Sequence, residues 1–317
     1  MYNMNQLFAE GLTENDPAKL LKVPKSDIHN HSTKGCSLTW LEHCLQYSLP
    51  KPPDRFNGLQ EMQEWFTSAI KPHCAEIDQS QKRWEGAFAE AKRNNIRRLA
   101  MNFSVQDINA AGGMDSFRAI VKNFHAKYCP DTLFEPEITY VSTCNIDLEA
   151  ERIDRYIESG FFTSIDVCGY ENIQPFEAFL PLYRKAEKYH LTKIMHVGES
   201  GSAEDIQRAV ETLALDEVHH GIHAVSSEPV MRFLADHGIQ LNVCPTSNVK
   251  LGYAAGYKDH PIKILYENGI KLTINTDDLL LFNSSIENEY LLLYRSGALG
   301  IAALNEIREI GLNGRRT

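Results

Sequence analysis

The chain has 317 residues, of which 43% are hydrophobic and 23% charged, a composition typical of a globular protein. The chain is long enough to bury a large hydrophobic core. Its formal net charge of -10 argues against a general nucleic-acid-binding surface. The first residues lack the basic start and apolar run of a signal peptide, and no apolar stretch of about 18 residues could span a membrane, so we expect a cytoplasmic protein.

Hydrophobic patterning predicts eight short strands that alternate with helices. The strands are expected at 26–31, 96–105, 133–141, 162–167, 192–197, 217–220, 239–243 and 271–276. Helices are expected at 80–94, 114–128, 147–159, 176–189, 203–213, 228–237 and 261–268. Strict alternation favours a parallel sheet, and eight such units favour an α/β fold of the (β/α)8 TIM-barrel type. No linker interrupts the pattern, so a single domain covering 1–317 is expected.

Residues 40–70 interrupt the alternation after the first predicted strand. They carry aromatic and large apolar side chains at helical spacing, and Pro50, Pro52 and Pro53 break the run in its middle. We therefore expect a helical insertion here. Two alternatives remain open: the insertion forms a lid over the active site, or it packs on the outside of the barrel.

Side chains of the metal-ligand type stand at the ends of four predicted strands. The first, fifth, sixth and eighth strands end in His29, His31, His196, His219, His220, Asp277 and Asp278. Barrel enzymes place their active sites at the C-terminal ends of the strands. His29 and His31 would share one face, whereas the adjacent acids Asp277 and Asp278 would point to opposite faces, one into the site and one onto its rim.

Four of these residues form a plausible metal-binding set. His29, His31, His196 and Asp277 offer three imidazoles and one carboxylate. This set suits a borderline divalent metal, zinc first, with one position open for water. A water bound to such an ion is acidified toward neutral pH and becomes a nucleophile.

Three further residues suggest how the reaction would use that water. Glu199 follows His196 by three residues and could protonate a ring nitrogen of the substrate as the water attacks. His220 could orient the water or stabilise its charge without binding the metal. Asp278 would then face the substrate, beside the metal ligand Asp277.

These motifs resemble the adenosine deaminase family of the metal-dependent amidohydrolases. The matching stretches are Asp27 to His31, Ile165 to Glu171, His196 to Glu199, His220-Gly221, Val243 to Asn248 and Asn275 to Asp278. They occur in the family's order, and the resemblance covers roughly residues 25 to 315. The C-P-T-S-N and N-T-D-D runs are specific for the family, while H-x-H is shared with the whole superfamily.

The resemblance implies a zinc-dependent hydrolytic deaminase of an adenosine-type aminopurine, with one Zn2+ per chain. Metal-bound hydroxide would add to C6 of the purine, and ammonia would leave. Glu199 would deliver a proton to N1, and His220 would assist the hydroxide. The backbone N–H of Gly169 would meet N3, and Asp278 would hydrogen-bond N7. Counted with the metal ligands, the expected catalytic residues are Glu199, His220 and Asp277, and the expected substrate contacts are Gly169, Asp278 and His31.

The chain departs from the family pattern directly after H-x-H. It reads Ser32-Thr33-Lys34-Gly35, one residue longer than usual and with a lysine in place of the acid that reaches the ribose. Lys34 is either a solvated lysine that never meets substrate or a point charge for a phosphate or another acidic substituent. Deamination of an AMP-like nucleotide, a modified adenosine or a free base therefore stays open, as does a purine-binding protein that has lost turnover.

Several neighbouring residues are expected to have structural roles. His219 is expected to be a structural or rim residue, and His223 a structural one. Cys244 is expected to be a small buried residue, because no base lies at the spacing that a nucleophile needs. The partner expected from the sequence is a small-molecule purine, with no nucleic acid or membrane, and the sequence does not indicate an oligomeric state.

Overall fold

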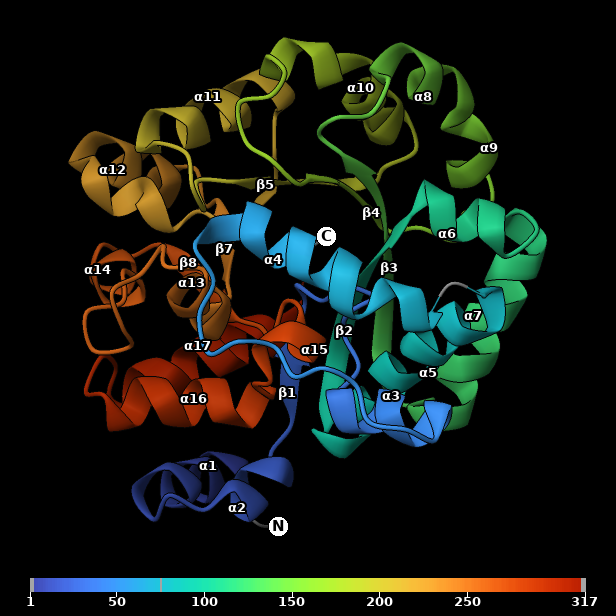
Figure 1. The fold of residues 1–317 in the computed structure, drawn as a ribbon. Helices are drawn as coiled ribbons and strands as arrows, with labels where there is room; N and C mark the ends of the chain where they lie inside the picture. Colours follow the sequence, from blue (N-terminus) through green and yellow to red (C-terminus); the bar gives the residue numbers. More distant parts are fainter. Residues whose placement is uncertain (1–2, 75, 315–317) are drawn as a thin grey trace.

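A computed structural model describes residues 3–74 and 76–314, so the ends of the predicted domain, 1 and 317, lie outside the described part. Its eight parallel strands follow one another around a barrel in the order β1 to β8 (Figure 1). Their bounds are β1 (Lys25–Asp27), β2 (Ile96–Ser104), β3 (Leu133–Val141), β4 (Ser164–Cys168), β5 (Thr192–Val197), β6 (Glu217–His220), β7 (Gln240–Val243) and β8 (Lys271–Ile274). A parallel bridge between Asn30 and Asp277 brings together the segments that follow β1 and β8. The predicted (β/α)8 barrel is confirmed.

The first strand is shorter than predicted. It ends at Asp27, whereas the sequence pattern extended it through His31. The backbone N–H of Ile28 donates to the side-chain oxygen of Asn275 at 2.8 Å, so a side chain takes the place of a strand partner. His29 and His31 therefore stand beyond the ladder, on a segment held by isolated bridges.

Helices follow the strands and cover the outside of the barrel (Figure 1). Between β2 and β8 they are α6 (Val105–Ala110), α7 (Met114–Tyr128), α8 (Ile146–Arg152), α9 (Asp154–Ile157), η2 (Phe176–Phe179), α10 (Leu180–Lys188), α11 (Ala203–Leu213), η3 (Ile222–Ser226), α12 (Glu228–Asp236), α13 (Pro245–Lys250) and α14 (Ile262–Glu267). After β8 come α15 (Leu279–Phe282), α16 (Ile286–Arg295) and α17 (Ile301–Asn313). Within the described ranges, no helix combines the length and apolarity that a membrane crossing requires.

Helix α11 shows why these segments fold as they do. Ser202 caps its N-terminus by accepting from the Asp205 N–H, and the Asp205 carboxylate accepts in return from the Ser202 N–H. Its buried residues Ile206, Ala209 and Leu213 recur at helical spacing and face the barrel core. Cap and periodicity agree, and the helix has the bounds predicted from the sequence.

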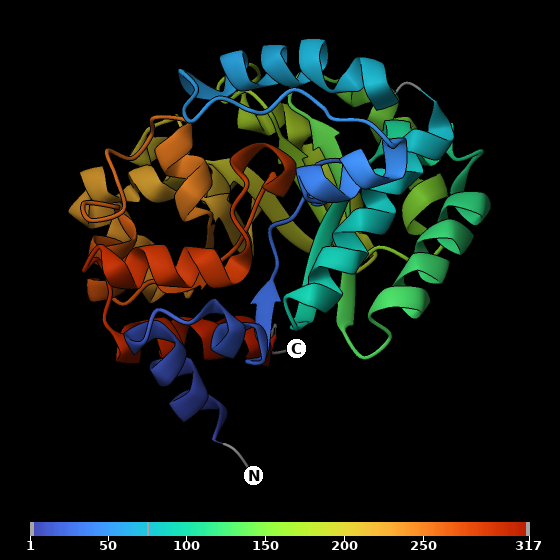
Figure 2. The same cartoon turned by 60° about the horizontal axis from the view of Figure 1, so that its bottom comes forward.

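The insertion after β1 folds as α3 (Leu38–Leu45), α4 (Gly58–Ala69) and η1 (Lys71–Cys74), followed by α5 (Ile77–Arg93). Helix α4 lies across the end of the barrel to which β1 points, while α1 (Met4–Thr13) and α2 (Pro17–Leu21) lie at the opposite end (Figure 2). A second small core forms under the insertion, and it includes Met62, Phe66 and Leu281. Within this segment, α4 lies over a cavity at this end of the barrel, whereas α3 packs beside α5.

Asp27 ties the first strand to the last. Its carboxylate accepts from the Thr276 N–H at 3.1 Å, from the Thr276 hydroxyl at 2.6 Å and from the Asn30 amide at 3.1 Å. All three residues are buried. A buried carboxylate is tolerated only when such donors satisfy it, so this cluster stabilises the junction between β1 and β8.

Replacing Thr276 by valine should weaken this junction. Thr276→Val keeps the side-chain shape but removes the O–H donor, so the free energy of unfolding should fall by about 1–3 kcal/mol. Thr276→Ser, which keeps the hydroxyl, is the matched control and should lose less. Urea unfolding followed by circular dichroism measures both, and equal losses in the two variants would show that the hydroxyl does not stabilise the junction.

Candidate active site

A cavity of about 460 Å³ opens at the C-terminal ends of the strands, beneath α4. Most of the predicted site residues line it, namely His31, Gly169, His196, Glu199, His220, Asp277 and Asp278. His29 lies below them and is 1% exposed. The structure thus brings together, in one place, residues from the ends of β1, β4, β5, β6 and β8.

Two of these residues leave their strands in a left-handed backbone conformation. His220 has φ 65° and Asp277 has φ 58°. Such conformations are uncommon outside glycine, cost on the order of 1–3 kcal/mol each, and persist only where the surrounding fold holds them. After the turn at Asp277, both Asp277 and Asp278 are buried and line the cavity. The prediction that one acid would lie on the rim is wrong.

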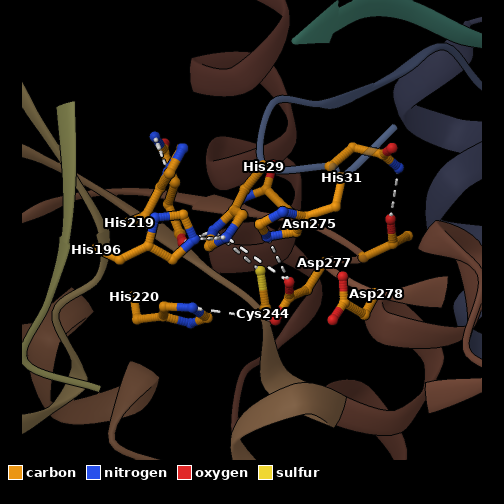
Figure 3. A network of polar contacts seen from close by, with 12 residues as sticks. His29, His31, His196, His219, His220, Cys244, Asn275, Asp277 and Asp278 are labelled. Atoms are coloured by element: carbon orange, nitrogen blue, oxygen red, sulfur yellow. Dashed lines mark hydrogen bonds and ion pairs between the residues drawn. The ribbon is translucent and has the colours of Figure 1, made fainter. Parts of the chain in front are cut away.

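The rings of His29 and His196 turn their Nε2 atoms toward each other, and neither atom carries a proton. His29 Nδ1 lies 3.0 Å from the backbone carbonyl of Asn242, and His196 Nδ1 lies 2.9 Å from a carboxylate oxygen of Asp166. Both partners are acceptors, so each ring carries its proton on Nδ1. The two Nε2 atoms are then unprotonated and lie 3.0 Å apart (Figure 3). Two lone pairs at this distance repel each other unless a cation lies between them.

His31 and Asp277 complete the group. Oδ1 of Asp277 lies 3.0 Å from His31 Nε2 and 3.8 Å from His29 Nε2. The side-chain nitrogen of Asn102 lies 2.8 Å from His31 Nδ1 and donates to it, so His31 Nε2 carries the proton that it donates to Asp277; turning the Asn102 amide would reverse this tautomer and free Nε2 for a metal. Burial opposes ionisation of Asp277, but the hydrogen bond from His31 and the nearby imidazoles hold its pKa well below the usual range.

These residues fit a divalent metal ion. Burial lowers the pKa of His29 to about 3, so its ring stays neutral and able to donate a lone pair. Neutral imidazoles facing an ionised carboxylate are the donors that borderline metals prefer. His29 and His196 belong, with His219, to one group of potential ligand atoms within 4.8 Å of one another, and His31 and Asp277 belong to another with Asp278.

Two other buried side chains lie close to His29. Cys244 Sγ is 3.3 Å from His29 Nδ1, but burial raises the pKa of its thiol well above the usual range, which makes it a poor ligand. His219 stacks on His29 with ring centroids 3.9 Å apart. Its nitrogens lie 3.3 Å from Glu137 Oε1 and 3.2 Å from Asn242 Nδ2, which fits the predicted structural role inside the barrel and not at its rim.

Glu199 and His220 form a second pair in the cavity. Glu199 Oε1 lies 3.5 Å from His220 Nδ1 and accepts from the Asn248 amide at 3.4 Å. Burial, and then the negative charge of Asp277, raise the pKa of Glu199 well above its usual range. Burial lowers the pKa of His220 well below its usual range. Both shifts favour the uncharged forms, a protonated carboxyl beside a neutral imidazole.

Two residues that hold the site were assigned no role from the sequence. The Glu171 carboxylate accepts from the backbone N–H groups of Gly198, Glu199 and Ser200, at 2.7, 3.0 and 2.6 Å, and so fixes the loop that carries Glu199. Asp166 orients His196 from inside β4. The available signal was an acid within an apolar strand, which is costly unless it has a partner.

Lys34 lies in the cavity and not in bulk solvent. Its side chain is 12% exposed, and Nζ lies 2.7 Å from Asp278 Oδ2. The alternative of a solvated lysine is therefore wrong. The other oxygen of Asp278 is buried without a hydrogen-bond partner in the described part of the chain. Gly169, at φ 105°, brings backbone to the same cavity.

Comparison with known proteins assigns this chain to a family. The family model described as adenosine deaminase matches residues 140–315. A putative adenosine/adenine deaminase from Treponema pallidum (strain Nichols) is 30% identical over 263 residues, which cover 83% of this chain and 88% of that protein. Three adenosine deaminases match over a shorter stretch, 45% of their own length.

Solved structures share the fold. A zinc-bound amidohydrolase from Burkholderia ambifaria has a TM-score of 0.75 at 18% identity, over 99% of this chain and 88% of that one. The N6-mAMP deaminase of Arabidopsis has a TM-score of 0.77 at 17% identity, over 93% and 94%. The family model and the Treponema relative show that this chain belongs to the adenosine deaminase family.

Proposed function

We propose that the protein is a metal-dependent hydrolytic deaminase of an adenosine-type aminopurine, which replaces the C6 amino group by oxygen and releases ammonia. The observation that carries the proposal is the pair of Nε2 atoms of His29 and His196, 3.0 Å apart, beside a cavity lined by Glu199, a residue whose pKa is raised by burial. The substrate class follows from the relatives, which are described as adenosine or adenine deaminases.

Zn2+, one per chain, is the proposed metal, and His29, His31, His196 and Asp277 would hold it. Three nitrogen donors and one carboxylate suit zinc, and a zinc-bound amidohydrolase shares the fold. When bound, such an ion supplies Lewis-acid activation of a water molecule. Asp166 and the Asn242 carbonyl would keep two of the rings in the tautomer that ligation needs.

The proton transfers fall to Glu199 and His220. Burial raises the pKa of Glu199 and so favours its protonated form, which would donate its proton to N1 as the oxygen of water adds to C6. His220 is neutral because its site is buried, and it would accept a hydrogen bond or a proton from the incoming water. Asn248 lies within 3.4 Å of both side chains and keeps them in register.

The purine ring would be held from two sides. Gly169 would offer its backbone N–H to N3, and Asp278 would donate to N7 through its unpartnered oxygen when that oxygen carries a proton. His31 would contact the substrate from the metal side.

One domain covering 1–317, with its insertion at 40–70, stays a proposal. The cytoplasmic location and the lack of nucleic-acid or membrane partners stay predictions from composition.

Glu199→Gln should abolish turnover. The amide cannot deliver the proton to N1, so ammonia release should fall by about 10²- to 10⁴-fold. Ammonia and ultraviolet absorbance are measured on metal-loaded protein with adenosine, deoxyadenosine, AMP, adenine and N6-methyl-AMP. Glu204→Gln, on the exposed side of α11, is the matched control and should keep full activity. An active Glu199→Gln variant would contradict the assignment of Glu199 as the proton donor. If the metal-loaded wild-type protein turns over none of these substrates, the proposed deaminase activity is refuted.

Removing the metal should also stop the reaction, and Zn2+ should restore it. Asp166→Asn should lower metal affinity by about 10- to 100-fold, because His196 loses the carboxylate that fixes its tautomer. Competition with a chromogenic chelator measures the affinity. Asp236→Asn, an exposed change at the end of α12, is the control. Unchanged affinity in Asp166→Asn would show that Asp166 does not orient His196 for metal binding.

A further inference from the structure

Three cationic side chains gather on one wall of the cavity, around the ring of Phe66 in α4. The Nζ atoms of Lys34 and Lys71 lie 5.4 and 5.8 Å from the ring centroid, and the guanidinium carbon of Arg83 lies 5.9 Å from it. All four residues line the cavity, although they come from the loop after β1, from η1, from α5 and from α4. The chain as a whole carries a net charge of -10, so overall composition does not account for this cluster.

Arg83 is buried, and within residues 3–74 and 76–314 no carboxylate forms an ion pair with it. It is 7% exposed, and it donates to the Thr33 carbonyl and to the Ser80 hydroxyl, both at 3.1 Å. Its Nε is buried and has no hydrogen-bond partner among residues 3–74 and 76–314. The nearby acid Asp107 is engaged by Ser104 at 2.8 Å. Asp107 interacts with Arg83 through its charge but does not hydrogen-bond it, so the buried guanidinium lacks a direct carboxylate partner in the described part of the chain, and an anion in the cavity would offset the cost of burying it.

The two lysines leave further donors free. Lys34 donates one N–H to Asp278, and its ammonium group has three N–H donors in total, so two remain. Lys71 is exposed at the cavity mouth, and the described part of the chain records no ion pair for it. The wall therefore holds more positive charge than the carboxylates beside it balance.

We propose that Lys34, Lys71 and Arg83 form an oxyanion subsite, and that the preferred substrate is an aminopurine nucleoside bearing a phosphate at its sugar end. The inference rests on the proposed function and refines its substrate class. Lys34 contacts Asp278, which is proposed to face the purine, so the subsite adjoins the base. An arginine fork and two ammonium groups match the oxygens of a phosphate. The same chemistry would also hold inorganic phosphate beside an uncharged nucleoside.

Product binding tests the subsite without turnover. Calorimetry compares inosine and inosine 5′-monophosphate on the zinc-loaded protein, and the monophosphate should bind at least about tenfold tighter. Lys71→Ala should reduce only the monophosphate affinity, by roughly three- to tenfold, and Arg83→Gln should reduce it further. Lys71 is exposed, so its variant should fold even if Arg83→Gln does not. Lys122→Ala, on the exposed face of α7, is the control of equal charge.

Deamination of adenosine and AMP is measured in parallel, with and without inorganic phosphate. A preference for AMP that Lys71→Ala reduces supports the subsite. Equal affinities of inosine and its monophosphate, or equal losses for both in Lys71→Ala, overturn it while leaving the deaminase standing. If added inorganic phosphate raises the deamination rate of adenosine to that of AMP, the subsite binds a free phosphate ion. That result overturns the proposal that the substrate itself carries the phosphate. If the protein binds the monophosphate in a way that depends on Lys71 and yet releases no ammonia from any substrate, that result supports the subsite and refutes the deaminase activity.

Discussion

The site depends on one unfavourable contact, the two bare Nε2 atoms of His29 and His196 that lie 3.0 Å apart. Neither ring can relieve it by changing tautomer, because the Asn242 carbonyl and the Asp166 carboxylate hold both protons on the Nδ1 side. Protonating His29 is opposed by burial, which lowers its pKa to about 3. A cation relieves the repulsion directly. Four strands contribute to this arrangement, and they meet only because the barrel is parallel and nearly closed.

The same cavity keeps two carboxyl groups in opposite protonation states. Asp277 lies among imidazoles, which lower its pKa and favour the ionised form, whereas Glu199 is desolvated near other negative charges, which raises its pKa and favours the protonated form. Environment therefore separates a metal ligand from a proton donor, although both are acids at a strand end or just beyond one. Glu171 maintains the separation by pinning the backbone that carries Glu199.

Residue types and strand order were predictable from the sequence, but the details that align the site were not. Alternating strand and helix patterns gave the barrel and placed His196 and His220 at strand ends. The early end of β1 depends on Asn275, whose side chain replaces a strand partner. The left-handed turn at Asp277 is stable only in the finished fold. Lys34 and Asp278 lie 244 positions apart in sequence, so no local pattern could reveal their ion pair.

Helix α4 and the loop after H-x-H meet at the proposed oxyanion subsite. Phe66 of α4 presents its ring to Lys34 from that loop and to Arg83 from α5. Covering the wall with an aromatic ring keeps water away and strengthens any charge-assisted contact made there. An uncharged nucleoside would leave the Arg83 Nε buried and unpaired. Discrimination would then arise from the penalty on the wrong substrate as well as from the attraction of the right one.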